Sequence, residues 1–174
     1  MDYLPVFFKI TNQPCLVVGG GHIAKRKVNL LLKAEAKVTV IALEVLPELK
    51  AQILASGGQV IEQAYQASYV ANQRLVIAAT DDLALNKQVF DDCEALSIPV
   101  NVVDAPDLCR FIFPSIIDRS PVVVAISSSG QSPVLARMLR TRLESIIPAA
   151  YGQLAAFVGS FRKQVQQVLP DTSL

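Results

Sequence analysis

Short apolar runs alternate with longer amphipathic segments along the first hundred residues. The run Leu75-Val76-Ile77-Ala78-Ala79 is apolar throughout, as is typical of parallel strands that are covered on both faces. On this pattern we predict strands over residues 14–18, 37–42, 59–61, 74–79, 98–103 and 122–127.

The segments between these strands have the period of helices. In the first of them apolar residues recur at i, i+4, i+7 and i+8, at Ala24, Val28, Leu31 and Leu32, which makes one apolar stripe. Further helices are predicted over residues 46–55, 83–96, 134–147 and 152–168. Because strands and helices alternate, right-handed crossovers should connect them. We therefore expect an α/β fold, a Rossmann-like doubly wound parallel sheet that extends to about Val103.

The last third of the chain has a different pattern. After Asp118 it predicts one strand, a Ser/Gly loop and two helices, with no further strand. The last helix carries an apolar stripe of Leu154, Phe157, Val158, Phe161, Val165 and Val168. Packing on its own domain, a subunit interface and a missing downstream domain are all compatible with this stripe. Since the chain stops at Leu174, soon after the helix, we expect that it is cut from a longer protein.

Composition and charge exclude several classes of protein. Hydrophobic residues make up 52% and charged residues 18%, which is enough apolar material for a core and argues against disorder. Sixteen Lys and Arg balance fifteen Asp and Glu, so no overall charge favours nucleic acid as a partner. The longest uncharged stretch is broken by Pro121, Gly130 and Pro133, and we expect neither a membrane span nor a signal peptide. The three cysteines lack a C-x-x-C spacing, as in a cytoplasmic protein with reduced thiols.

The strongest local motif is a glycine loop between the first strand and the first helix. Gly19 permits a tight turn, Gly21 allows a pyrophosphate to come close to the backbone, and Ala24 lets the helix pack tightly on the strand. The helix N-terminus offers amide groups and a partial positive charge to phosphates. His22 lies within the loop, where it is a ligand contact rather than a catalytic group. The motif predicts dinucleotide binding; the alternative is a structural turn in a fold that has lost its cofactor.

An acidic residue about twenty positions after such a loop normally binds the ribose hydroxyls. Glu44 is the nearest candidate after the second strand, although it is equally compatible with a solvated residue at a helix start. No Arg directly follows this strand, which favours NAD over NADP.

Two strand ends supply carboxylates at the edge of the sheet where ligands bind in open α/β folds. Asp81 and Asp82 follow the fourth strand, where helix capping alone explains them. Asp104 follows the fifth strand, just before Pro106, and no clear helix follows it, so capping explains it less well.

A Ser/Gly loop over residues 127–132 precedes a helix that carries Arg137, Arg140 and Arg142. Such a loop at a helix start is a candidate anion cradle. An ordinary N-cap at Ser132 with Pro133 at the next position is the alternative, but it leaves three preceding serines unexplained.

These motifs together resemble the N-terminal half of siroheme synthase and the related stand-alone precorrin-2 dehydrogenases, over essentially the whole chain. Beyond the glycine loop, the matching stretches are Ala78-Ala79-Thr80-Asp81-Asp82, Asn101-Val102-Val103-Asp104-Ala105-Pro106, Phe113-Pro114-Ser115-Ile116-Ile117-Asp118-Arg119-Ser120-Pro121 and Ser132-Pro133-Val134-Leu135-Ala136-Arg137. Glu35 departs from the glycine that relatives often place after the first helix, which removes a favourable C-cap.

The resemblance implies a Rossmann domain over residues 1–113, a dimerisation segment over 114–150 and the start of a helical domain over 151–174. It implies a homodimer that oxidises precorrin-2 to sirohydrochlorin with NAD, and in many members inserts ferrous iron at the same site to give siroheme. Asp104 matches the catalytic aspartate, and no permanent metal site is expected. The expected cofactor contacts are Gly19, Gly21, His22, Ile23, Leu43, Glu44 and Thr80.

The substrate is a polycarboxylate, so it should be met by cations and hydrogen-bond donors. We expect these from Arg119, Arg137, Arg140 and the serine loop, with a further hydrogen bond from Asn101, although surface solvation also explains each arginine. Ser128 falls where some relatives have a phosphorylatable serine, and a phosphate there should repel the substrate carboxylates. Two alternatives stay open: a dehydrogenase without chelatase activity, and a non-enzymatic NAD-binding redox sensor.

Overall fold

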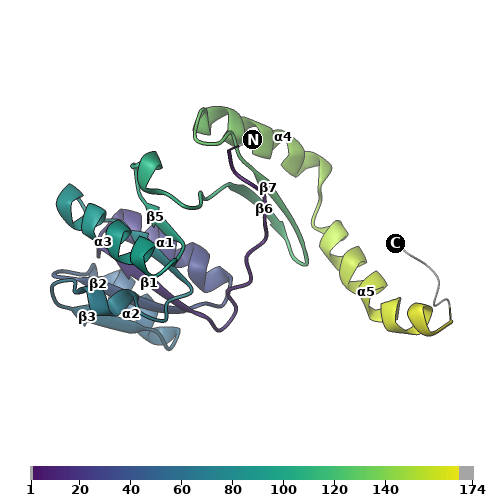
Figure 1. Cartoon of the computed structure of the whole chain (residues 1–174). Helices are drawn as coiled ribbons and strands as arrows, with labels where there is room; N and C mark the ends of the chain where they lie inside the picture. Colours follow the sequence, from purple (N-terminus) through teal and green to yellow (C-terminus); the bar gives the residue numbers. More distant parts are fainter. Residues whose placement is uncertain (1, 169–174) are drawn as a thin grey trace. The chain divides into compact units, whose positions relative to one another are not determined.

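The computed structural model describes residues 2–168 of the chain (Figure 1). Residues 169–174, the last part of the expected helical domain, lie outside the described residues. The chain divides into two compact units, Met1–Ile112 and Phe113–Leu174.

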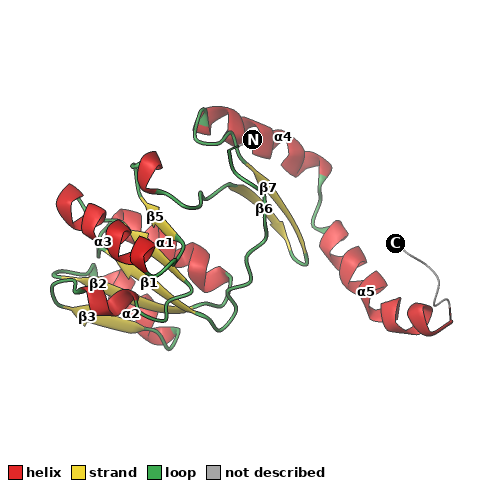
Figure 2. Ribbon diagram, viewed as in Figure 1, coloured by secondary structure: helices red, strands yellow, loops and turns green. Residues whose placement is uncertain are grey.

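The N-terminal unit contains a five-stranded parallel sheet with the strand order β3-β2-β1-β4-β5 (Figure 2). The strands are β1 Pro14–Val18, β2 Lys37–Ala42, β3 Gln59–Glu62, β4 Leu75–Ala78 and β5 Val100–Val102. The connections contain the helices α1 His22–Lys33, α2 Pro47–Ala55 and α3 Leu83–Ala95, with 3-10 turns η1 Ala67–Val70 and η2 Pro106–Leu108.

This strand order places the first strand, β1, in the middle of the sheet. The chain winds outward from β1 to β3 and then returns to β4 and β5 on the other side of β1. Right-handed crossovers therefore place α1 and α2 on one face and α3 on the other. The structure confirms the Rossmann-like doubly wound sheet.

The central strands are apolar because both faces of the sheet are covered. Every residue of β4 is buried, as are the last four residues of β1. In the register of the sheet, Val18 pairs with Ile41 of β2 and with Ala78 of β4. The carboxyl ends of these three strands therefore meet at one edge, and the loops that follow them converge there.

The C-terminal unit differs from the expectation in one element. It contains the strands β6 Ser115–Arg119 and β7 Val122–Ile126 and the helices α4 Pro133–Ile146 and α5 Ala150–Val168. The sequence pattern predicted a single strand here, whereas β6 and β7 form an antiparallel hairpin. The Asp118 carboxylate accepts hydrogen bonds from the Ser120 amide at 3.0 Å and the Ser120 hydroxyl at 2.6 Å. This Asx-type turn closes the hairpin.

Helix α5 begins against the hairpin and continues with an exposed apolar stripe. A Cβ at Gly152 would lie 2.3 Å from the Arg119 carbonyl oxygen, so the first turn packs closely on β6. Further along, the side chains of the stripe are at least 45% exposed at Leu154, Phe157, Val158, Phe161 and Val165. Packing on its own unit, one of the three interpretations of the stripe, therefore does not cover these five side chains. Within residues 2–168, no helix has the length and hydropathy needed to cross a bilayer.

Candidate active site

The N-terminus of α1 is open to a ligand. Gly21 is the N-cap residue, no side chain bonds to this cap, and the first turn holds no acidic residue. The first amide groups of an α-helix have no partner within the helix. A Cβ added at Gly21 would find no atom within 4 Å. This free space beside unpaired amide groups fits a dinucleotide pyrophosphate.

The two preceding glycines have packing roles. Gly19 has φ +125°, and a Cβ there would lie 2.3 Å from the Ala79 carbonyl oxygen at the end of β4. A Cβ at Gly20 would lie 2.0 Å from the Glu44 carbonyl oxygen, and the Gly20 carbonyl accepts a hydrogen bond from the Leu46 amide at 3.0 Å. Gly20, which the motif alone did not single out, holds the loop after β2 against the glycine loop.

A pocket of about 240 Å³ lies at the carboxyl edge of the sheet. Ile23 of α1, Thr80 after β4 and Asp104 after β5, which the sequence predicted as site residues, all line it. The remaining lining residues are Ala79, Asp81, Leu83, Asn86, Val103 and Ala105. The first turn of α1 and the two loops after β4 and β5 therefore bring an apolar residue, a threonine and an aspartate to one cavity.

Asn86 orders the β4–α3 loop at this pocket. It is a buried polar residue of α3. Its side-chain amide nitrogen donates to the Thr80 main-chain carbonyl at 2.9 Å, and the Thr80 hydroxyl donates to the side-chain amide oxygen of Asn86 at 2.7 Å. Asp82 caps α3 by accepting from the amides of Ala84 and Leu85, as capping alone predicted. Asn86 thus fixes Thr80 against the cavity.

Asp104 is exposed and sits in a left-handed backbone conformation, with φ +59°. Hydrogen bonds hold the main chain on both sides of it: the Val103 amide donates to the Ala78 carbonyl at 2.9 Å, and the Ala105 amide donates to Val102 at 3.3 Å. Left-handed residues other than glycine are uncommon and cluster at functional sites. The turn η2 follows, and its N-cap is Ala105 without a side-chain bond, so Asp104 does not cap it.

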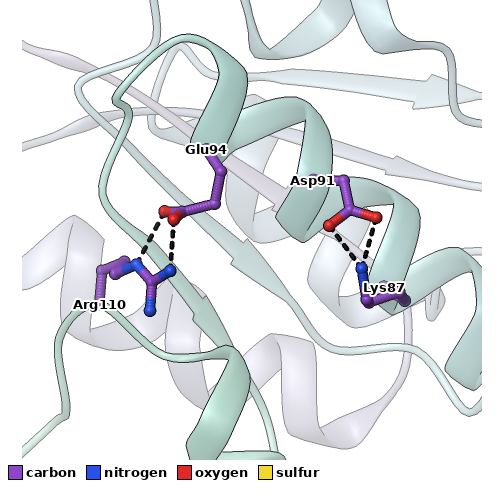
Figure 3. A network of polar contacts seen from close by, with 4 residues as sticks. All are labelled: Lys87, Asp91, Glu94 and Arg110. Carbon is purple, nitrogen blue, oxygen red and sulfur yellow. Dashed lines mark hydrogen bonds and ion pairs between the residues drawn. The ribbon is translucent and has the colours of Figure 1, made fainter.

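The segment after Asp104 is tied back to the N-terminal unit. The Asn101 amide donates to the Phe111 carbonyl at 2.9 Å. Arg110 forms a two-pronged ion pair with Glu94 of α3, and Figure 3 shows it beside the Lys87–Asp91 pair of the same helix.

Asn101 was expected to donate a hydrogen bond to the substrate. The structure instead buries it and directs its amide nitrogen to the main chain after η2. This hydrogen bond ties the segment to β5, and a contact of Asn101 with the substrate stays a prediction.

Lys27 is a half-buried cation near the pocket that sequence reasoning passed over. Burial lowers its pKa, while attraction to Cys109 and Asp104 raises it and the neighbouring Arg26 lowers it further. Burial raises the pKa of the Cys109 thiol. The signal available in the sequence was its spacing, since Lys27 lies four residues after Ile23 and hence on the same face of α1.

The other expected cofactor contacts lie on the surface beside the glycine loop. His22, Leu43 and Glu44 are exposed. Glu44 approaches the glycine loop through its main chain, at Gly20. Their placement leaves their side chains accessible to a ligand.

In the C-terminal unit, the serines of the 127–132 loop order the loop itself. The Ser127 hydroxyl accepts from the Ser129 amide at 3.0 Å, and the Ser128 hydroxyl accepts from the Ser132 amide at 2.9 Å. Ser132 caps α4 by accepting from the Leu135 amide at 3.3 Å. The amide groups that an anion cradle would use at these three positions are therefore engaged, which accounts for two of the unexplained serines.

The three expected substrate arginines differ in their surroundings. Arg140 forms an ion pair with Glu144, four residues further along α4, at 3.1 Å. Arg119 donates from Nε to the Ile147 carbonyl and from Nη1 to the Asp118 carbonyl, each at 3.1 Å, and its Nη2 lies 3.5 Å from Glu144. It thus joins the hairpin to the end of α4. Arg137 is exposed on the first half of α4.

The parallel sheet, the glycine loop and the carboxylate at a strand end together define a dinucleotide-binding protein of the Rossmann class. The family model described as "Putative NAD(P)-binding" matches residues 6–115, more than half of the chain. The chain therefore belongs to this NAD(P)-binding family.

Two further family models match the rest of the chain. "Sirohaem biosynthesis protein central" covers residues 119–146 and "Sirohaem synthase dimerisation region" covers residues 150–174. Together with the first model they confirm the resemblance to the siroheme synthase family found in the sequence.

Curated relatives and a solved structure agree with this placement. The siroheme synthase of Pseudomonas putida (strain W619) is 54% identical over 173 residues, which are 99% of this chain and 37% of the relative. That of Psychrobacter sp. (strain PRwf-1) is 50% identical over 170 residues, 98% of this chain and 35% of the relative. The chain thus spans little more than a third of these relatives. The solved structure of SirC, a precorrin-2 dehydrogenase, matches with a TM-score of 0.73 over 99% of this chain and 83% of its own, at 24% identity, which shows a common fold.

Proposed function

We propose that this chain oxidises precorrin-2 to sirohydrochlorin with NAD, releasing NADH and a proton. The observation that carries the proposal is the pocket at the sheet edge, where the start of α1, Thr80 and Asp104 meet. The names of the relatives support the choice of substrate.

In this proposal one group of residues binds the cofactor and another residue transfers the proton. The amide groups after Gly21 would hold the pyrophosphate, with Leu43 and Glu44 on the ribose side and Thr80 beside the reacting end. NAD, when bound, supplies the hydride acceptor. Asp104 accepts the proton that the substrate loses with the hydride, since its carboxylate lines the pocket and the main chain around it is fixed.

We further propose that ferrous iron is a second substrate. Iron insertion into sirohydrochlorin displaces pyrrole N–H protons, and the Asp104 carboxylate can accept protons in this step as in the first. Supporting this, Asp104 is exposed on the pocket side and so is accessible to a tetrapyrrole.

The C-terminal unit would contribute substrate contacts and the dimer. Arg137 and the serine hydroxyls at 127 and 128 are the better candidates for the substrate carboxylates, since Arg119 is engaged within the unit. A phosphate on Ser128 would repel the same carboxylates. The exposed apolar stripe of α5 supports a homodimer. We also propose that the Rossmann domain ends at residue 113 and that the dimerisation segment ends at residue 150.

The test is anaerobic incubation with precorrin-2 and NAD, followed by absorbance for NADH and sirohydrochlorin. Asp104→Ala should lower turnover by about a hundredfold or more, the usual contribution of a general base. Asp107→Ala, which removes an exposed carboxylate of η2, is the matched control and should retain turnover. Near-normal NADH production by Asp104→Ala would remove the assignment, and NAD binding by the native chain without any turnover would refute the enzymatic function.

Iron insertion is assayed separately, with sirohydrochlorin and ferrous iron in the absence of NAD. Incorporation by the native chain that Asp104→Ala loses is the expected result. A chain that makes sirohydrochlorin without taking up iron is a dehydrogenase only.

A further inference from the structure

The Thr80 hydroxyl beside the pocket belongs to a set of hydrogen bonds whose directions can be assigned. The Thr80 main-chain carbonyl can only accept, so the Asn86 group that faces it at 2.9 Å is the side-chain nitrogen. The Asn86 side-chain oxygen is then the group that faces the Thr80 hydroxyl, at 2.7 Å. Because an amide oxygen also can only accept, Thr80 is the donor in this second bond.

This donation uses the single proton of the Thr80 hydroxyl. The other oxygen within its reach, the Asp82 main-chain carbonyl at 3.2 Å, is likewise an acceptor. The Asp82 amide donates to the hydroxyl at 3.2 Å and so occupies one of its two lone pairs. For a ligand in the pocket, the Thr80 hydroxyl therefore has one lone pair left and no proton.

The surroundings of Asn86 keep this arrangement from changing. Asn86 is 3% exposed and lies on α3, where a turn of its side chain would leave buried polar atoms without partners. Asp82 anchors the same loop, since its side chain accepts from the amides of Ala84 and Leu85 at the start of α3. The direction of the Thr80 hydroxyl is thus fixed by the fold before any ligand binds.

We propose that Thr80 accepts a hydrogen bond from the amino group of the nicotinamide carboxamide, and that Asn86 is the positioning residue that makes the hydroxyl an acceptor. The inference rests on NAD as the cofactor of the proposed function. With its pyrophosphate at the start of α1, the dinucleotide crosses the carboxyl edge of the sheet, where Thr80 and Asp104 line one pocket. A carboxamide offers an amino group and a carbonyl oxygen, and only the amino group can pair with a hydroxyl that has no proton to give. This pairing determines which way the carboxamide turns.

The hydrogen-bond direction is tested first, on the protein without cofactor. Thr80→Val keeps the size of the side chain but leaves the buried Asn86 oxygen without its donor, whereas Thr80→Ser keeps the hydroxyl. An unpaired buried acceptor is destabilising, so Thr80→Val should lower Tm by at least about 2 °C, and Thr80→Ser by less. Thr141→Val makes the same exchange at an exposed position of α4 and should leave Tm unchanged. A native Tm in Thr80→Val would overturn the inference.

The carboxamide contact is tested by calorimetric titration with NAD and two of its analogues. In the acetylpyridine analogue a methyl group replaces the amino group; in the thionicotinamide analogue sulfur replaces the carbonyl oxygen and the amino group stays. A neutral hydrogen bond contributes about threefold to tenfold in Kd, so the native chain should bind the acetylpyridine analogue more weakly than NAD by this factor. The thionicotinamide analogue should bind nearly as tightly as NAD. In Thr80→Val the preference for NAD should disappear, while Thr141→Val should keep it.

Asn86→Leu tests the positioning role, because it removes the nearest acceptor of the Thr80 proton and leaves the hydroxyl in place. The hydroxyl can then donate to the carbonyl oxygen that NAD and the acetylpyridine analogue share, so the ratio of their two Kd values should fall toward that of Thr80→Val. A purely structural role would weaken both ligands equally and keep the native ratio, which would refute the assignment of Asn86. The smaller Asn86→Ser makes the same test if thermal unfolding shows that Asn86→Leu does not fold.

The results separate this inference from the proposed function. A native chain that binds NAD and the acetylpyridine analogue equally refutes the inference, even if it oxidises precorrin-2. A native chain that prefers NAD as predicted but does not oxidise precorrin-2 refutes the proposed function and leaves the inference standing. A native chain that does not bind NAD refutes both.

Discussion

The adjacent glycines Gly20 and Gly21 should respond differently to the same one-carbon change, Gly20 in stability and Gly21 in NAD binding. In Gly20→Ala the new Cβ would lie 2.0 Å from the Glu44 carbonyl oxygen and 2.8 Å from the Val45 Cα, both main-chain atoms. The two loops must then separate by more than an ångström. Overpacking of this kind costs about 1–3 kcal/mol, and against fixed backbone we expect about 3 kcal/mol. For a chain of this size that lowers Tm by roughly 6–12 °C.

Gly21→Ala is the matched control, because its Cβ meets nothing within 4 Å and its φ of −89° suits alanine. The exchange of glycine for alanine at an N-cap costs less than about 1 kcal/mol. The added methyl group occupies the space that we assign to the pyrophosphate, so the Kd for NAD should rise by roughly tenfold or more, equivalent to about 1.4 kcal/mol.

Thermal unfolding followed by circular dichroism measures the first effect, and calorimetric titration with NAD measures the second. The reasoning fails if Gly20→Ala unfolds at the native temperature, or if Gly21→Ala binds NAD as tightly as the native chain does.

Two further changes test the fold itself. Glu35 ends α1 at φ +58°, so Glu35→Gly should raise the free energy of unfolding by about 0.5–1 kcal/mol in urea denaturation; a loss of stability would show that its side chain has another role. Burial raises the pKa of Cys15 to about 11 and of Cys93 to about 12, from 9.0. Because these thiols ionise first in the unfolded chain, the free energy of unfolding should hold up to about pH 9 and fall as the pH rises toward 11 and 12. A fall of equal slope in the double variant Cys15→Ala/Cys93→Ala would assign it to other groups.

The parallel sheet was predictable because its strands are short runs of apolar residues, which fit few structures other than a strand buried on both faces. A run such as Leu75–Ala78, apolar at every position, is compatible with a strand buried on both faces, and the structure buries all of it. The hairpin was not predictable in the same way. The strand β6, Ser115–Arg119, has only Ile117 fully buried, and its connection depends on the side chain of Asp118 rather than on a glycine-containing turn.

The candidate site was predictable where it depends on strand ends and less so where it depends on side-chain direction. Thr80 and Asp104 line one pocket because parallel strands end at the same edge. Asn101 is a polar residue within the otherwise apolar strand β5, and its side-chain amide nitrogen donates to the Phe111 carbonyl. Arg119 likewise meets carbonyl groups of its own unit. Such choices between a ligand and the main chain are decided by contacts between residues far apart in the sequence.

The ion pair between Arg110 and Glu94 has a mechanical consequence. With the Asn101 amide on Phe111, it fastens the chain to α3 and β5 just before the boundary at Ile112. The ion pair and the amide hydrogen bond therefore fix the residues between the Asp104 turn and Ile112 to the sheet and to α3. The Asp104 turn is thus anchored by contacts that lie within the N-terminal unit.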